Sequence, residues 1–266
     1  MKRAVYSALI GNYERLLPQP AAVDSDIEFL LFTDSRTIDT DSNWSPIRVE
    51  PRFESDSVRS ARYLKIVGHP SLNNYDETLW IDNRVILRRG FESIFDLNTG
   101  YDMSIPIHSF REELREEFIA VLSMGFDDPA RVRQMYAIAR SAKLDSSQTL
   151  WTGLLVRKRN PTIENCMRVW MDYLLLTSRR DQLSINLAIR ETSPSVNYMP
   201  IENWHSEFHD WTSSDQIQRK ARVQKWRSER VPLGLRVGDR VRALPNGHKI
   251  ARALSRAGLH LPTLPN

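Results

Sequence analysis

Short apolar runs alternate with longer amphipathic stretches along most of the chain. Six runs of four to seven residues have the length of buried strands: 4–10, 27–32, 45–50, 78–81, 102–107 and 151–157. Four longer stretches carry apolar residues every three or four positions, as amphipathic helices do: 57–68, 112–124, 129–142 and 163–176. Strands that alternate with helices predict an α/β fold with a largely parallel or mixed central sheet.

Two acidic residues stand where the predicted chain changes direction. Asp82 directly follows the apolar run 79–81, and Asp181 with Gln182 opens a predicted helix whose apolar face begins at Leu183. Strand ends and helix starts face the ligand crevice of an α/β sheet. The pair therefore predicts a site for a phosphorylated, hydroxyl-rich ligand such as a nucleotide sugar. Ordinary structural roles are the alternatives, with Asp82 accepting backbone hydrogen bonds in a turn and Asp181 capping its helix.

Cations accompany both acidic residues. Arg59, Arg62 and Lys65 fall at helical spacing on one flank of the predicted helix 57–68, where they would neutralise a diphosphate or form a solvated face. Arg179 and Arg180 precede Asp181, and their forked guanidinium groups suit pairing with a carboxylate or a phosphate.

Histidines offer further candidate ligands. His205 and His209 are four residues apart, one helical turn, so that one of them could complete a metal site with Asp82 or simply pack at an interface. His108 and Arg111 follow the predicted strand 102–107, where contacts to an acceptor or a phosphate would be made.

Size and composition indicate the class of protein. With 266 residues, of which 41% are hydrophobic and 9% aromatic, the chain can form one large α/β domain or two small ones. A single cysteine, Cys166, excludes an intramolecular disulfide and predicts a buried thiol. No stretch approaches the roughly 18 apolar residues of a membrane span, so we expect a cytoplasmic protein.

Charge divides the chain near residue 215. From Ile217 onward, 12 Lys or Arg stand against Glu229 and Asp239, a net charge of +10, whereas the residues before it carry −6. We expect a domain at 1–215 and a basic extension at 216–266 with helices at 216–230 and 248–259. The extension would be a solvated tail, a contact with anionic lipid at the inner membrane face, or a contact with nucleic acid. Basic residues beside Trp226 favour lipid, and no nucleic-acid-binding motif is visible, so no nucleic acid is expected.

Several motifs together resemble a known family. They are Ile10-Gly11-Asn12-Tyr13, Phe32-Thr33-Asp34-Ser35, Arg59-Ser60-Ala61-Arg62-Tyr63-Leu64-Lys65, Trp80-Ile81-Asp82, His108 with Arg111, Gln134-Met135-Tyr136 and Arg180-Asp181-Gln182-Leu183-Ser184. Their order and spacing over residues 1–211 resemble a glycosyltransferase-like family, long described as a domain of unknown function, with members in bacteria and in plant mucilage and turgor proteins.

The resemblance implies a GT-A fold, in which a Rossmann-like nucleotide-binding half is fused to an acceptor half. It implies transfer of a sugar from a nucleotide-sugar donor to a glycan, polysaccharide or lipid-linked acceptor. By position, the base and ribose would contact Tyr13 and Asp34. The diphosphate would contact Arg62 and Lys65, and the sugar would contact Asp181 and Gln182. The further residues expected to bind the donor are Arg59, Asn83, Arg84 and Arg180. The acceptor would contact His108 and Arg111, and Asp82 would bind a manganese or magnesium ion.

One departure from the family pattern concerns the metal. Relatives carry Asp-Gly-Asn where this chain reads Asp82-Asn83-Arg84. A cation at the third position would repel a divalent metal ion, or replace it by neutralising the diphosphate. We therefore expect weak metal dependence. Two other functions remain open, a GT-A-like binding module without catalysis that docks on anionic lipid or a polyanion, and a metal-dependent phosphoesterase.

Overall fold

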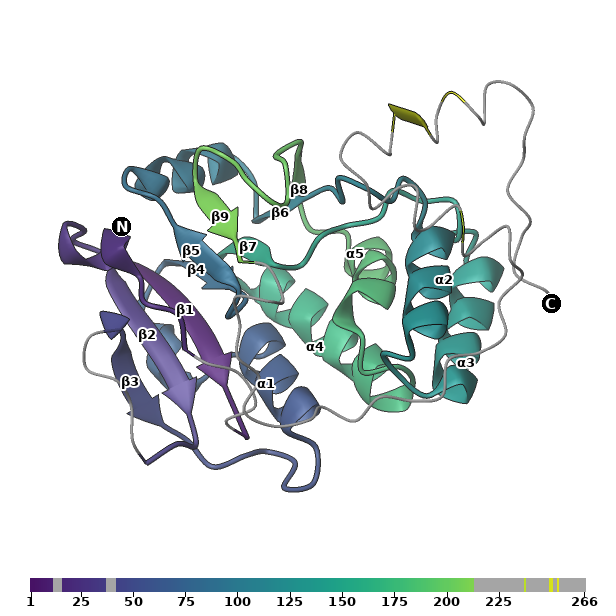
Figure 1. The fold of residues 1–266 in the computed structure, drawn as a ribbon, viewed down its shortest axis with the longest axis horizontal. Coiled ribbons are helices and arrows are strands. Elements are labelled where there is room, and N and C mark those ends of the chain that lie inside the picture. The colour runs from purple at the N-terminus through teal and green to yellow at the C-terminus, as the bar shows by residue number, and fades with distance from the viewer. Residues whose placement is uncertain (12–15, 37–41, 213–236, 238–248, 251–252, 254–266) are drawn as a thin grey trace.

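The computed structural model describes residues 1–266 except 12–15, 37–41, 213–236, 238–248, 251–252 and 254–266. Its centre is a seven-stranded sheet with the strand order β3-β2-β1-β4-β7-β6-β8 (Figure 1). Strands β1 (Arg3–Leu9), β2 (Glu28–Thr33), β3 (Ser45–Arg48) and β4 (Glu77–Ile81) are mutually parallel. They form the Rossmann-like half of the sheet.

The other half of the sheet is mixed. Strand β7 (Leu154–Lys158) is antiparallel to both β4 and β6 (Met103–Pro106), whereas β8 (Val196–Met199) is parallel to β6. Because β7 is reversed, its amino end lies at the same edge of the sheet as the carboxyl ends of β1, β4 and β6. Loops from both halves therefore meet at one edge.

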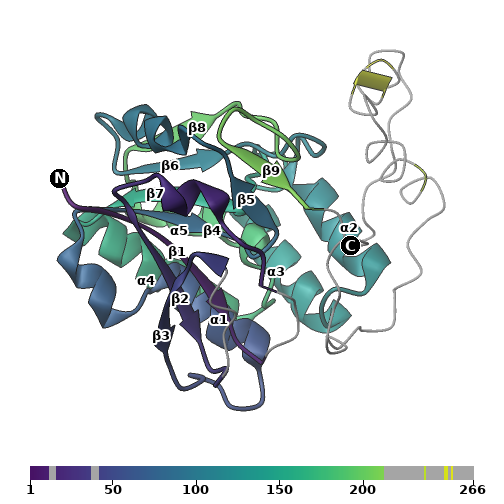
Figure 2. The same cartoon turned by 60° about the vertical axis from the view of Figure 1, so that its left-hand side comes forward.

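Both faces of the sheet are covered, which explains why the central strands are almost continuously apolar. In β1, Tyr6 and Ala8 belong to a buried cluster with α1 (Ser57–Ile66), α4 (Pro161–Leu176) and α5 (Ile185–Thr192). Val5 and Leu9 face the opposite cluster, with the 3₁₀ segment η4 (Phe91–Asn98) and the small sheet of β5 (Val85–Leu87) and β9 (His209–Trp211) (Figure 2).

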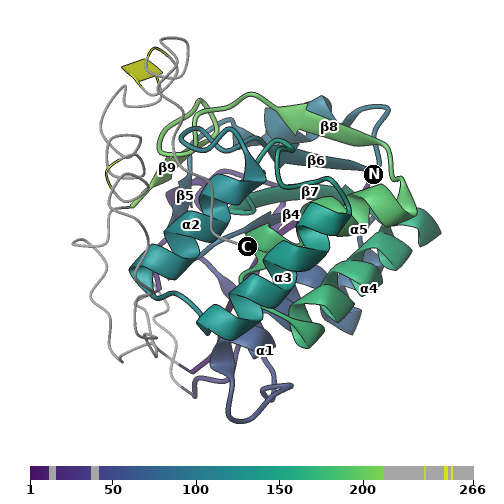
Figure 3. The same cartoon turned by 90° about the vertical axis from the view of Figure 1, so that its right-hand side faces the viewer.

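Helices α2 (Leu114–Met124) and α3 (Pro129–Ser141) lie side by side next to α5 and form a third buried cluster (Figure 3). That cluster includes Leu183 of the 3₁₀ turn η5 (Asp181–Leu183), so the two helices support the segment that carries Asp181. Side-chain caps define several helix starts. Asp56 accepts from the Arg59 amide at 2.9 Å, and Asn160 accepts from the Ile163 amide at 2.9 Å.

Two short 3₁₀ turns lie in the connections, η1 (Pro20–Val23) and η3 (Pro70–Asn74). Among the described residues, no helix combines the length and the apolar character needed to cross a membrane.

The predicted α/β class with a mixed, mostly parallel sheet is confirmed, and each of the ten predicted strands and helices overlaps an observed element. Two local predictions are wrong. The helix expected from Asp181 begins only at Ile185, after a 3₁₀ turn, and residues 205–209 are not helical. The helices predicted at 216–230 and 248–259 fall almost entirely outside the described residues.

Candidate functional site

A cavity of about 300 Å³ opens at the edge of the sheet where the loops of both halves meet. Ala8 near the end of β1, residues at the ends of β4 and β6, the residue Trp151 before β7, and residues of α1, α2 and the segment 179–182 are among those that line it. The lining residues are Ala8, Val58, Ala61, Arg62, Trp80, Asp82, Asn83, Arg84, His108, Arg111, Glu117, Ala120, Gly125, Phe126, Trp151, Arg179, Arg180, Gln182 and Trp211. The placement agrees with the general position of ligands in open α/β sheets.

Asp82 directly follows β4 and reaches into this cavity. Its Oδ1 accepts from the Trp80 indole nitrogen at 2.9 Å and lies 3.3 Å from the Lys65 ammonium and 3.7 Å from the Arg62 guanidinium. The carboxylate keeps 22% of its side-chain surface exposed. It is therefore held in place by cations on one side and accessible to a ligand on the other.

Asp181 lies beneath the cavity and is enclosed, with a side chain 1% exposed. The Lys65 ammonium approaches its Oδ2 at 2.6 Å, the Thr152 hydroxyl donates to the same oxygen at 2.9 Å, and the Arg62 Nε lies 3.1 Å from its Oδ1. Burial raises the pKa of this carboxyl, but the nearby Arg62 and Lys65 charges outweigh burial and hold the pKa below its ordinary value. Asp181 is thus a stable buried anion.

Lys65 joins the two carboxylates and is itself fully buried. Burial lowers the pKa of its ammonium, while Asp181 and Asp82 act in the opposite direction. The ammonium also lies 5.4 Å from the centre of the Trp80 ring. We expected Lys65 to contact a diphosphate directly, but its ammonium is enclosed and does not line the cavity. Its position suits a role in fixing Asp82 and Asp181.

Asn83 and Arg84 tie neighbouring segments to the end of β4. The Asn83 side chain accepts from the Ser7 hydroxyl at 2.9 Å and donates to the Ala8 carbonyl at 3.1 Å. The Arg84 guanidinium donates twice to the Thr212 carbonyl, at 2.7 and 3.0 Å, and lies over the Trp211 ring. Arg84 therefore adds a positive charge to the cavity wall at a fixed position.

The residues around Asp82 do not fit a divalent metal ion. Within the described part of the chain, no three His, Cys, Asp or Glu side chains form a group that could hold one. The Asp82 carboxylate already pairs with Lys65 and Arg62 through its Oδ1, and an added dication would lie close to both charges.

His205 and His209, which we expected to complete a metal site with Asp82, make other contacts in the structure. His205 is largely exposed and lies 2.6 Å from Asp210, which in turn is held by Arg88 at 2.8 Å. His209 is buried in β9, contacts the Asn203 carbonyl at 3.0 Å and stacks on Trp151. Burial lowers the pKa of His209, so a neutral packed imidazole is its role here.

His108 and Arg111 both line the cavity, as expected for acceptor contacts. The Arg111 Nη1 lies 2.8 Å from the His108 Nε2 and 2.9 Å from Glu117 of α2. Burial, followed by the Arg111 charge, holds the pKa of His108 well below its ordinary value, so this imidazole is neutral. Sequence reasoning missed Glu117, which is one of several charged residues in α2 and has no distinguishing local signal.

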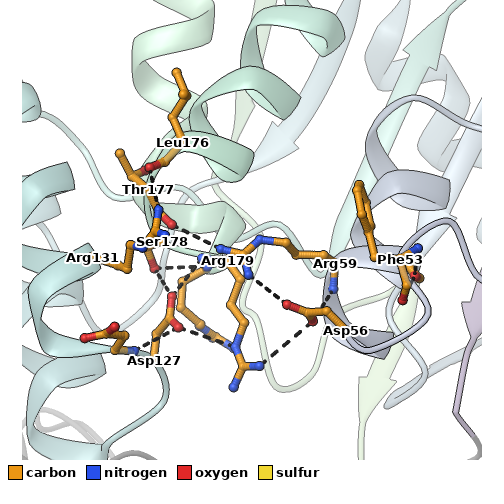
Figure 4. Close-up of polar contacts among 12 residues, drawn as sticks. Phe53, Asp56, Arg59, Asp127, Arg131, Leu176, Thr177, Ser178 and Arg179 are labelled. Atoms are coloured by element: carbon orange, nitrogen blue, oxygen red, sulfur yellow. Dashed lines mark hydrogen bonds and ion pairs between the residues drawn. The ribbon is translucent and has the colours of Figure 1, made fainter.

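A second network fixes the segment before Asp181 (Figure 4). Asp127 is buried, and its Oδ2 accepts from the Ser178 hydroxyl at 2.6 Å and from the Arg179 amide at 2.7 Å. The Arg179 side chain lies 3.5 Å from Asp127 and 4.0 Å from Asp56, the cap of α1. Arg59 also pairs with Asp56, at 2.7 Å, and does not line the cavity, in contrast to its expected role as a donor contact.

Arg180 and Gln182 flank Asp181 and line the cavity. The Arg180 guanidinium lies 5.2 Å from the Phe126 ring centre, a cation–π arrangement. The network of Asp127 fixes the backbone at Arg179, directly before Arg180.

The predicted contacts to base and ribose concern the ends of β1 and β2. Asp34 follows β2, and both of its carboxylate oxygens lie 3.0 Å from the Gly11 amide. Gly11 has a φ of +78°, and a Cβ at this position would lie 2.8 Å from the Cβ of Ser57, so a larger residue would not fit. Tyr13 lies outside the described residues.

No family model matches the chain, and no curated protein matches it. The solved structures that are similar over most of its length include the following three. They are the apo WbbM bifunctional glycosyltransferase (13% identity, 75% of this chain, TM-score 0.44), the galactosyltransferase LgtC with donor and acceptor sugar analogues (15%, 74%, 0.40) and core-mannan synthase A (CmsA/Ktr4) from Aspergillus fumigatus in its Mn/GDP form (10%, 86%, 0.42). The matches span 39% of the WbbM chain, 72% of LgtC and 81% of CmsA. Similarity this distant does not identify an activity, which rests on the chemistry of the site.

Proposed function

We propose that this chain is a glycosyltransferase that moves a sugar from a nucleotide-sugar donor to a glycan or lipid-linked acceptor. The observation that carries the proposal is the convergence of Asp82, Arg62 and Arg84 on one cavity at the carboxyl edge of a Rossmann-like half-sheet. An accessible carboxylate beside fixed guanidinium groups suits a ligand that combines hydroxyl groups with a diphosphate.

The charges around the cavity support departure of a nucleoside diphosphate. Bond cleavage at the anomeric carbon leaves negative charge on the diphosphate, and preorganised cations stabilise such charge without reorganisation. Arg62 and Arg84 line the cavity and are held by Asp181 and the Thr212 carbonyl, respectively. We therefore assign leaving-group stabilisation to these two arginines, in place of a metal ion.

The two aspartates take different roles in this proposal. Asp82 is accessible and would contact the donor sugar or accept the proton of the acceptor hydroxyl. Asp181 is enclosed, and its lowered pKa makes it a weak base, so we assign it to positioning Arg62 and Lys65. Gln182, which lines the cavity next to Asp181, would contact the sugar.

The cavity volume of about 300 Å³ lies at the lower end of the range for small-molecule sites. We propose that it holds the sugar and the diphosphate, and that the nucleoside extends toward Asp34. His108 and Arg111 would contact the acceptor from the opposite half of the sheet. Contact of the basic extension with an anionic membrane would place the reaction at the inner face of that membrane.

A thermal-shift screen of nucleoside diphosphates and nucleotide sugars, each with and without manganese, tests the proposal. A ligand present at about 100 times its dissociation constant stabilises the folded protein by about 2.7 kcal/mol. We expect a stabilising ligand among the nucleoside diphosphates, and a weaker response in Arg62→Gln and Arg84→Gln variants. Absence of any stabilising nucleotide would contradict the proposal. Binding without turnover would favour the non-catalytic module, and release of a sugar phosphate would favour the phosphoesterase.

A further inference from the structure

Two aromatic side chains form a corner at the surface beside the cavity. Phe110 is half-buried and Trp204 is 45% exposed, and their ring centres lie 5.6 Å apart with an interplanar angle of 60°. Tryptophan is usually well buried, so a large exposed indole face is a candidate contact surface. We call Phe110 and Trp204 the aromatic corner.

The aromatic corner contacts residues that line the cavity. The Phe110 ring lies 5.6 Å from the ring of His108, which lines the cavity. On the other side, the Trp204 carbonyl accepts from the amide of Trp211, another lining residue, at 2.7 Å. A molecule that extends out of the cavity past His108 would therefore meet these two rings.

Hydrogen bonds also fix the two loops of the aromatic corner to each other, although these loops are 94 residues apart in the sequence. The buried Asn203 side chain accepts from the Ser109 amide at 2.7 Å and donates to the Ile107 carbonyl at 2.9 Å. The Asn203 amide donates to the Ser109 hydroxyl at 2.9 Å. Glu202 accepts from the backbone amide of Trp204 at 2.9 Å. Because both loops are fixed in advance, binding here would lose little conformational entropy.

We propose that the aromatic corner is a subsite for a sugar ring of the acceptor glycan, one or more units beyond the hydroxyl that receives the transferred sugar. This inference rests on the proposed function. A sugar ring has an apolar C–H face and polar hydroxyl edges, which match a flat indole bordered by hydrogen-bonding groups. Because the rings meet at 60°, Trp204 offers the stacking face and Phe110 the side wall.

The charges beside the corner favour a neutral glycan over an anionic lipid surface. Glu202 lies next to Trp204 and contacts the amides of both Trp204 and His205. Asp210 is close by and pairs with Arg88. The Glu202 carboxylate can accept hydrogen bonds from sugar hydroxyl groups, whereas it would repel lipid phosphates. The acceptor class deduced here is therefore an oligosaccharide or polysaccharide chain.

The test measures binding to an immobilised panel of neutral di- to hexasaccharides of glucose, galactose and mannose, and to vesicles containing phosphatidylglycerol. The full-length chain is compared with Trp204→Ala, Trp204→Phe and Phe110→Ala variants. Tyr101→Ala is the matched control, because Tyr101 is also exposed (39%) but precedes β6 at its other end. We expect Trp204→Ala to weaken oligosaccharide binding by about tenfold, Trp204→Phe to retain most of it, and Tyr101→Ala to leave it unchanged.

Three results would overturn the subsite. The first is that no member of the panel binds. The second is that the Trp204→Ala variant and the unaltered chain bind oligosaccharides equally. The third is that the Trp204→Ala variant loses vesicle binding and keeps oligosaccharide binding. Thermal shift by nucleoside diphosphates, measured on the same variants, separates this inference from the proposed function. Trp204 does not line the cavity, so nucleotide binding should survive its replacement. Oligosaccharide binding without nucleotide binding would support the subsite and contradict the transferase.

Discussion

Replacement of Lys65 by methionine tests the buried ion network most sharply. Methionine keeps most of the length of the side chain and removes its charge, which leaves Asp181 enclosed, with Arg62 in contact and Arg180 further away. Breaking a buried ion pair by removing one partner costs about 3–5 kcal/mol. Because Arg62 and Thr152 still contact Asp181, we expect the free energy of unfolding to fall by the lower end of this range, about 3 kcal/mol. In a chain of this size, that loss lowers Tm by roughly 6–12 °C.

Urea unfolding followed by circular dichroism measures this loss. The matched control is Arg89→Met, because Arg89 forms a surface pair with Asp24 and is 87% exposed. Such surface pairs contribute about 0–1 kcal/mol. The double variant Lys65→Met/Asp181→Asn should be more stable than the sum of its single variants predicts, by about 1 kcal/mol or more, since the buried carboxylate that has lost its lysine partner is gone. A loss in Lys65→Met no larger than that in Arg89→Met would refute the reasoning.

Three further predictions concern pH, metal and the basic extension. Because the folded-state pKa of Asp181 is lowered, its contribution to stability is present at neutral pH and is lost as pH falls below about 4. The urea midpoint of an Asp181→Asn variant should therefore fall less between pH 6 and pH 3 than that of the unaltered chain, and equal slopes would contradict this assignment. Nucleotide-sugar turnover should be nearly insensitive to EDTA, and abolition by EDTA with full recovery on adding manganese would show the arginine-based mechanism to be wrong. A chain truncated after Asp215 should still bind nucleotide and should lose salt-sensitive association with anionic vesicles. If the truncated chain binds vesicles as well as the unaltered chain does, the extension does not contact the membrane.

The sequence predicts those parts of the fold that depend on local pattern. Apolar runs identify the strands, and the spacing of Arg62 and Lys65 places both side chains on one flank of α1. The apolar run 79–81 also predicts that Asp82, which follows it, lies at the end of a strand. The spacing alone does not show that Lys65 lies under the cavity while Arg62 reaches it, because burial depends on the strands against which α1 packs.

Non-local contacts account for the errors. His205 and His209 have the spacing of one helical turn, yet residues 209–211 form β9, which pairs with β5 more than 120 residues earlier. That pairing removes His205 and His209 from one helical face. Similarly, Arg59 is drawn away from the cavity by Asp56 and by the Thr177 carbonyl, 118 residues away.

The central claim is tested most directly by measuring nucleoside diphosphate release from a panel of nucleotide sugars, with the oligosaccharide panel as acceptors. We expect release that depends on an acceptor, and a loss of about 100-fold or more in Asp82→Asn and Arg62→Gln. Unchanged nucleotide affinity in the Asp82→Asn variant would show that its site is intact. If the protein releases no nucleoside diphosphate from any donor, or if Asp82→Asn turns over at the rate of the unaltered chain, the cavity at Asp82 is not a glycosyltransferase site.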